Sequence, residues 1–253
     1  MDVNYLVANN DELTAYQAFL ERHQQGLNDY IAFLRDRYAV QDLPRVMILA
    51  NRRSATEIIR QIPIPAYTND IRLVMTPDLQ VWQDLYVAQL APYEGFGEIA
   101  ELLSHYQNLT ENHLLQIIGH ELAHWSELFM DDFDDYDRYI WFEEGMVEYI
   151  SRRYFLTEPE FEAEKEANQL LVKLFQAKYG WHSLNDFGQA TYEGSIASIF
   201  YDYWRSFLTI DRLVETLGSV EAVFEAYGKW QSSETDQPLL DWFIAQGILE
   251  KEF

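Results

Sequence analysis

The sequence contains no cysteine, so it has no disulfide framework and no thiolate to act as a nucleophile. Any metal site must therefore use histidine, aspartate or glutamate. No apolar run approaches the roughly 18 residues of a membrane-spanning helix. The first residues, MDVNYLVANNDEL, also lack the basic and apolar segments of a signal peptide. We expect a cytoplasmic protein with no membrane partner, and we leave a processed secreted form open.

Basic residues are scarce: 18 lysines and arginines stand against 42 acidic residues, which gives a formal charge of −24. This balance argues against nucleic acid and anionic membranes as partners. The same charge is consistent with solubility alone, so it identifies no substrate. The length of 253 residues and the 48% share of hydrophobic residues suit one large domain with its own core.

The spacing of apolar residues predicts an α+β fold. The first 40 residues are predicted to be mainly helical, and two short β-prone runs follow at 45–50 (RVMILA) and 71–76 (IRLVMT). SATE at 54–57 and TEPE at 157–160 match capping boxes, and 78–98 is predicted to be strand or irregular loop. Helical patterns dominate from about residue 100. We therefore predict one domain, 1–253, with a small α/β lobe at 1–109, a mostly helical lobe at 110–253 and the functional site at their junction.

The segment IIGHELAHWSEL, residues 117–128, carries two of the six histidines. Thr110 is the expected N-cap of its helix. Residues four apart lie on one helix face, so His120 and His124 can present two imidazoles to one zinc ion. Glu121 borders that face, where it can take a proton from an activated water instead of binding the metal. The alternative is a polar helix face that happens to carry two histidines.

A catalytic zinc ion usually has a third protein ligand. The segment WFEEGMVEY, residues 141–149, offers Glu144 for that position on a second helix. Glu148 follows one turn later, where it can accept a hydrogen bond from a ligand histidine and fix its tautomer. The acidic segment 131–137 would let the two helices reverse direction and pack together.

HELAH followed by WFEEG resembles the gluzincin metallopeptidases, the group that contains thermolysin and the zinc aminopeptidases. In the aminopeptidase branch the glutamate before glycine in a W-L-N-E-G motif is the third zinc ligand, and this match selects Glu144. The spacing is one residue longer than is usual in the family, which makes Glu143 the competing candidate. The following Gly145 and the acidic partner Glu148 favour Glu144.

The resemblance extends to TYEGSIASIFYDYW at 191–204. Zinc aminopeptidases carry a Y-E-x-G segment whose tyrosine stabilises the oxyanion, which implies this role for Tyr192. Tyr201 and Tyr203 are reserve candidates, and a packing tyrosine is the alternative. The family's Gly-x-Met-Glu-Asn segment, which holds a substrate's amino terminus, is missing. The resemblance therefore covers roughly 110–205 and leaves substrate selection open.

The resemblance implies a zinc-dependent peptidase with one Zn²⁺ per chain and a peptide or protein substrate. A non-catalytic scaffold of the same kind, binding a peptide or protein partner, is the alternative. A deformylase-like hydrolase is disfavoured because those enzymes use a cysteine ligand. Nothing in the spacing supports His113 or His182 as ligands, and the sequence leaves the oligomeric state undetermined.

Overall fold

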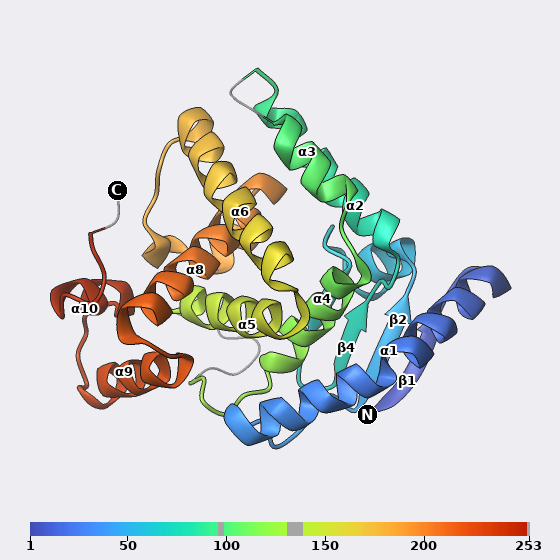
Figure 1. The fold of residues 1–253 in the computed structure, drawn as a ribbon, viewed down its shortest axis with the longest axis horizontal. Helices are drawn as coiled ribbons and strands as arrows, with labels where there is room; N and C mark the ends of the chain where they lie inside the picture. The colour runs from blue at the N-terminus through green and yellow to red at the C-terminus, as the bar shows by residue number, and fades with distance from the viewer. Residues whose placement is uncertain (96–98, 131–138, 252–253) are drawn as a thin grey trace. The chain divides into compact units, whose positions relative to one another are not determined.

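The computed structural model describes residues 1–95, 99–130 and 139–251, and these form an α+β fold (Figure 1). The strands are β1 (Asp2–Leu6), β2 (Val46–Ala50), β3 (Ala66–Thr68) and β4 (Arg72–Met75). The helices are α1 (Asn10–Arg37), α2 (Leu79–Ala88), α3 (Ala100–Gln107), α4 (Glu111–Ala123), α5 (Ile140–Phe155), α6 (Glu158–Tyr179), α7 (Gln189–Tyr192), α8 (Ile196–Leu217), α9 (Val220–Ser232) and α10 (Leu239–Ala245). A π-helical turn, Ser54–Ile59, and two 3-10 turns, Ala91–Tyr93 and Leu184–Asp186, complete them.

Contacts group the described residues into two compact units. The sheet unit contains 1–94, 99–130 and 150–161. The helical unit contains 95, 139–149 and 162–251. Helix α4 thus groups with the sheet, whereas the sequence analysis placed it in the helical lobe. Helix α5 contributes residues to both units.

The sheet has the strand order β1-β2-β4-β3, with β3 antiparallel at one edge and the other neighbours parallel. Central strands of parallel sheets are covered on both faces, which requires nearly continuous apolar sequence. The central strands β2 and β4 meet this requirement, because Leu49, Leu73 and Val74 are completely buried. The predicted strands at 45–50 and 71–76 are confirmed.

Helix α1 covers part of the sheet unit with an apolar stripe at helical spacing that includes Tyr16, Phe19 and Tyr30. Asn9 caps its N-terminus by accepting a hydrogen bond from the Glu12 backbone amide at 2.9 Å. Helix α4 packs against α1 and against strands β3 and β4. It carries His120 and Glu121, two of the residues predicted for the site.

The helical unit is organised around α8. The buried side of α8 includes Trp204, Phe207 and Leu213. Gly218 ends the helix in the left-handed conformation, with φ of 92°. Helix α9 packs against α8, and α10 packs against α9. Phe142 of α5 stacks on Tyr227 of α9, with ring centroids 4.4 Å apart. Aromatic packing therefore contributes to the core of this unit.

Three local predictions are wrong. Residues 2–6 form strand β1, which is held by parallel pairing with β2, where the sequence pattern suggested mainly helix. Residues 79–88 form helix α2, capped by the Asp78 carboxylate, where strand or loop was expected. Ser54 caps no helix; it is the first residue of the π-helical turn, and its backbone amide donates to the Asn51 side chain at 2.9 Å.

Among the residues that the structure describes, no helix is both long and apolar enough to span a bilayer.

Candidate metal centre

Helix α4 begins where the sequence predicts. The Thr110 side chain accepts from the backbone amide of Asn112, and the His113 side chain accepts from the Thr110 amide at 3.1 Å. His113 is therefore a capping residue, and this agrees with its exclusion as a ligand. The helix ends at Ala123, so His124 occupies the C-cap position, still with helical backbone angles of −57° and −19°. His120 and His124 consequently keep the one-turn relation that the motif requires.

The N-termini of α4 and α6 share one carboxylate, that of Glu160. It accepts hydrogen bonds from the Thr110 hydroxyl at 2.6 Å and from the side-chain amide of Asn112 at 2.9 Å. It also accepts from the backbone amide of Thr157 at 2.8 Å, which is the glutamate half of the capping box predicted at 157–160. Burial alone would raise the pKa of Glu160, but these hydrogen bonds together lower it to about 2. The helix that carries the histidines is therefore fixed at its start by an ionised group.

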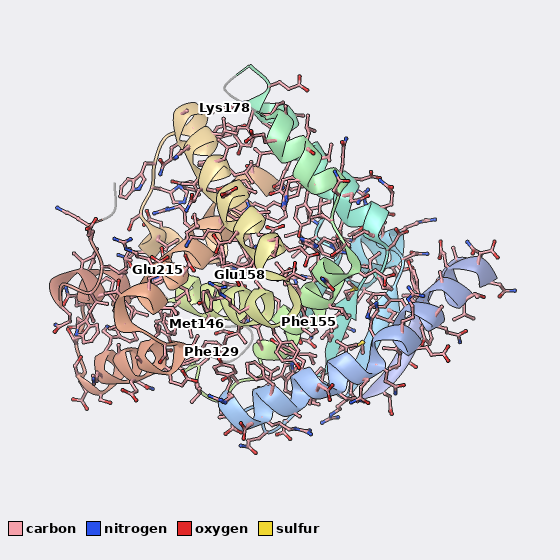
Figure 2. All side chains as sticks on the ribbon, viewed as in Figure 1. Phe129, Met146, Phe155, Glu158, Lys178 and Glu215 are labelled. Atoms are coloured by element: carbon pink, nitrogen blue, oxygen red, sulfur yellow. The ribbon has the colours of Figure 1, made fainter. Side chains whose placement is uncertain are left out.

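Gly119 sets the contact of α4 with its neighbours. A Cβ atom at this position would lie 2.6 Å from the Phe155 ring and 3.1 Å from the Tyr30 ring. Phe155 ends α5, as Figure 2 shows. The Tyr30 hydroxyl donates to the Gly119 carbonyl at 3.0 Å, and the Gln116 amide donates to the Ser151 hydroxyl at 3.2 Å. The absence of a side chain at Gly119 thus permits the close approach of Phe155 and Tyr30.

Gly145 has the corresponding role on α5. A Cβ atom there would lie 2.5 Å from the carbonyl oxygen of Ser206 and 2.6 Å from a side-chain carbon of Ile210. Only glycine permits this approach of α5 to α8. The glycine lies next to Glu144, so the close contact brings the Glu144 carboxylate to the residues of α8.

His120, His124 and Glu144 form a group that could hold a metal ion, because one ligand atom from each lies within 4.8 Å of the others. The two Nε2 atoms are 3.2 Å apart. His120 and Glu144 are buried, with 7% and 5% of their surfaces exposed. The structure thus brings together the three predicted ligands. The group contains Glu144 and not the competing Glu143.

Two tyrosine hydroxyls bind the Glu144 carboxylate. Tyr192 donates to Oε1 at 3.0 Å, Tyr203 donates to the same oxygen at 2.8 Å, and the two hydroxyls are 3.0 Å apart. Burial first, and then the negative charge of Glu144, raise the pKa of Tyr203 well above its ordinary value. Tyr203 is therefore a neutral hydrogen-bond donor.

The resemblance implies a role toward substrate for Tyr192, with Tyr203 as a reserve candidate. The contact of both with a predicted ligand is new. Their placement eleven residues apart on α7 and α8 carries no signal that would have revealed it. The other reserve candidate, Tyr201, accepts instead a hydrogen bond from Gln176 at 3.0 Å.

The remaining predicted residues lie on the same two helices. Glu121 is buried on α4, with 7% of its surface exposed, directly after His120. Glu148 is half-buried on α5, one turn after Glu144. Their roles as proton carrier and as partner of a ligand histidine stay predictions. The acidic segment 131–137 lies outside the described residues.

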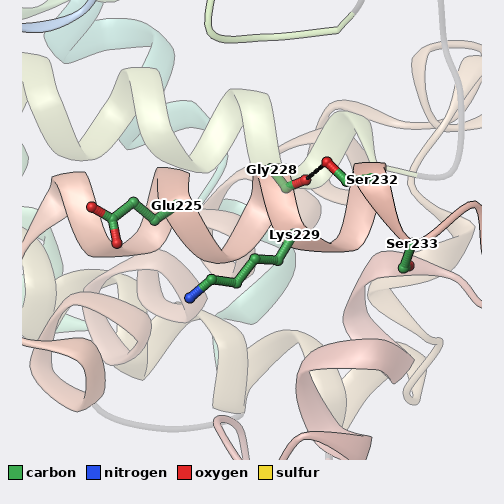
Figure 3. Close-up of a pocket in the computed structure, with 5 residues that line it drawn as sticks. All are labelled: Glu225, Gly228, Lys229, Ser232 and Ser233. Atoms are coloured by element: carbon green, nitrogen blue, oxygen red, sulfur yellow. Dashed lines mark hydrogen bonds between the residues drawn. The ribbon is translucent and has the colours of Figure 1, made fainter.

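An open depression on α9 is a different kind of site (Figure 3). It is lined by Glu225, Gly228, Lys229, Ser232 and Ser233. The Ser232 hydroxyl donates to the Gly228 carbonyl at 2.7 Å, which is an ordinary bond within a helix. These side chains offer no cluster of metal ligands or nucleophile with a base, so this depression supports no catalytic role.

Comparisons with protein families, with curated proteins and with solved structures gave no match to this chain.

Proposed function

We propose that this chain is a zinc-dependent peptidase with one zinc ion per chain, held by His120, His124 and Glu144. The observation that carries the proposal is the convergence of these three ligand atoms within 4.8 Å. It joins two segments, HELAH and WFEEG, that were selected from the sequence because of their likeness to gluzincins.

The donor set suits zinc. Two imidazoles and one carboxylate are the protein ligands of many catalytic zinc sites, which keep a fourth position open. Two nitrogens at 2.0–2.1 Å from one tetrahedral zinc would lie about 3.3 Å apart. The distance of 3.2 Å between the histidine nitrogens is close to this value. Softer metals that prefer thiolates are disfavoured, since the chain has no cysteine.

Zinc in such a site supplies Lewis-acid activation of a water molecule and of the scissile carbonyl. In this proposal Glu121 acts as the general base: its carboxylate takes a proton from the attacking water and delivers it to the leaving amine. Tyr192 donates a hydrogen bond to the oxyanion of the tetrahedral intermediate. The Tyr192 hydroxyl donates to Glu144 at 3.0 Å, so this role requires that it exchange this partner for the oxyanion.

The proposed substrate is an extended peptide lying beside β3. This strand is an edge of the sheet, and α4 packs against it. The Trp125 indole, one residue after His124, donates to the Thr68 hydroxyl on β3 at 3.1 Å. Edge strands can bind extended peptides through backbone hydrogen bonds, with pockets for alternate side chains.

The test begins with zinc analysis of the purified chain, followed by digestion of an unfolded protein with and without a chelator. Products are mapped by mass spectrometry. We expect about one zinc per chain and chelator-sensitive cleavage. Glu121→Gln should retain zinc but lose cleavage. Glu111→Gln is the matched control, because Glu111 begins the same helix and pairs with Arg22 at 2.6 Å. It should retain both.

Two results would contradict the proposal. Undiminished turnover in Glu121→Gln would eliminate Glu121 as the base. Zinc binding by the unmodified chain without cleavage of varied unfolded substrates would favour the alternative, a non-catalytic scaffold that binds a peptide or protein partner.

A further inference from the structure

A second buried carboxylate lies close to the tyrosine pair. Asp202 is on α8, directly before Tyr203, with 1% of its surface exposed. Its Oδ1 is 2.8 Å from Nε2 of His182, and its Oδ2 accepts a hydrogen bond from the Thr191 hydroxyl at 3.1 Å. A guanidinium nitrogen of Arg205 is 3.9 Å from Oδ1. A buried carboxylate is costly unless it is paired and hydrogen-bonded, and these partners satisfy Asp202.

Thr191 is the residue through which Asp202 reaches the candidate site. It lies in α7, a helix of only four residues, Gln189–Tyr192. Besides donating to Asp202, its hydroxyl accepts from the backbone amide of Gly188 at 3.3 Å, the residue that precedes α7. A helix this short has no stability of its own in water. Its position therefore depends on contacts of this kind.

The two tyrosines that bind Glu144 are supported differently. Tyr203 belongs to the 22-residue helix α8, which already approaches α5 closely at Gly145. Tyr192 is the last residue of α7 and directly follows Thr191. Both rings also face Phe187, at centroid distances of 5.9 Å for Tyr192 and 5.5 Å for Tyr203. The bond between Thr191 and Asp202 is thus a polar link from α7 to α8 at the residue next to Tyr192.

We propose that Asp202 is a positioning residue: through Thr191 it fixes α7 so that the Tyr192 hydroxyl meets the Glu144 carboxylate. It does not touch the substrate, and it acts only through Tyr192. The inference rests on the proposed function, because the placement of Tyr192 on Glu144 matters for catalysis only if Glu144 binds the metal. The placement of the Tyr192 ring can nevertheless be measured without metal or activity.

The first experiment measures that placement by NMR of the metal-free chain, with its tyrosine rings labelled with ¹³C. Tyr192→Phe and Tyr203→Phe identify the two signals. Thr191→Val removes the hydroxyl but keeps the shape, and it should shift or broaden the Tyr192 signal more than the Tyr203 signal, because Tyr203 belongs to the long helix α8. Thr191→Ser restores a hydroxyl and should restore the Tyr192 signal. An unchanged Tyr192 signal in Thr191→Val would overturn the proposal.

Asp202→Asn should change the Tyr192 signal in the same way. Asp211→Asn is the matched control, because Asp211 is also buried on α8 but pairs with Lys165 of α6. It should leave the Tyr192 signal unchanged. If both variants alter this signal equally, the effect comes from general loosening of α8, and the specific role of Asp202 is refuted.

The second experiment uses peptide cleavage. Thr191→Val should lower kcat about tenfold, the lower limit typical of losing a supporting residue, with KM unchanged. In a Tyr192→Phe background the same change should have no further effect, whereas an additional tenfold loss would overturn the proposal. If the chain cleaves no peptide, the proposed function fails, while the NMR result still decides whether Asp202 positions Tyr192.

Discussion

The contact between α5 and α8 at Gly145 makes a quantitative prediction for Gly145→Ala. The added Cβ atom would lie 2.5 Å from the Ser206 carbonyl oxygen, whereas ordinary contact begins at 3.4 Å. The difference, 3.4 − 2.5 = 0.9 Å, must be absorbed by separating two helices, because the obstructing atom belongs to the backbone. Overpacking of this kind costs about 1–3 kcal/mol. Alanine recovers up to about 1 kcal/mol of helix propensity, and because the obstructing atom is backbone we expect the upper end of the range, a net loss of about 2 kcal/mol.

The matched control is Gly228→Ala, the same substitution in the interior of α9. No atom lies within 4 Å of a Cβ built at Gly228, so only the propensity gain applies. This variant should gain about 0.4–1 kcal/mol. Urea unfolding monitored by circular dichroism measures both changes, which should have opposite signs. Equal or greater stability of Gly145→Ala relative to the unmodified chain would refute the close contact.

A displacement of nearly 1 Å at Gly145 also moves its neighbour Glu144. Binding constellations tolerate errors of only about 0.5 Å, so Gly145→Ala should weaken zinc binding even in the folded protein. Competition with a chromophoric chelator measures this loss. Zinc affinity that is unchanged in a destabilised Gly145→Ala variant would separate the packing role of Gly145 from the proposed metal site.

Two further predictions concern carboxylates. Glu160→Gln should lose about 1–2 kcal/mol of unfolding free energy at pH 7: the lowering of its pKa from 4.5 to about 2 corresponds to at most about 3 kcal/mol, and solvent reduces this. Because the folded-state pKa is the lower one, this stabilisation is present above pH 4.5 and disappears as the pH falls through 2. In acid titrations, a difference in unfolding free energy between Glu160→Gln and the unmodified chain that persists below pH 2 would contradict the stabilising role of the ionised carboxylate. Glu144→Ala should abolish zinc binding in metal analysis, whereas Glu143→Ala should leave about one zinc per chain; the reverse result would make Glu143 the ligand.

Local signals in the sequence revealed those elements whose stability is local. The capping pattern at Thr157 and the N-cap at Thr110 depend on residues within one turn, and both are present. Strand β1 was missed because parallel pairing with β2 holds it, across a separation of more than forty residues. Helix α2 was missed although its signals are local: Asp78 caps it, and its buried residues Trp82 and Leu85 are three residues apart.

The same distinction applies to the candidate site. The one-turn relation of His120 and His124 is a property of a helix, and it was predictable from their spacing. The choice of Glu144 depended on a glycine whose function is visible only where α8 approaches it. The contact of Tyr203 with Glu144 and that of Thr191 with Asp202 are tertiary. No spacing rule for a single element predicts such contacts.

The end of α4 has a consequence for the entropy of metal binding. His124 lies beyond the last helical residue, yet the two residues that follow it are attached to other elements. Trp125 donates to Thr68, while Ser126 donates to the carbonyl of Tyr38 and forms a β-bridge with Val40. The backbone that carries the second imidazole therefore has little conformational entropy left to lose on metal binding. Binding of a metal would then have to order only the His124 side chain, because the backbone beneath it is already held.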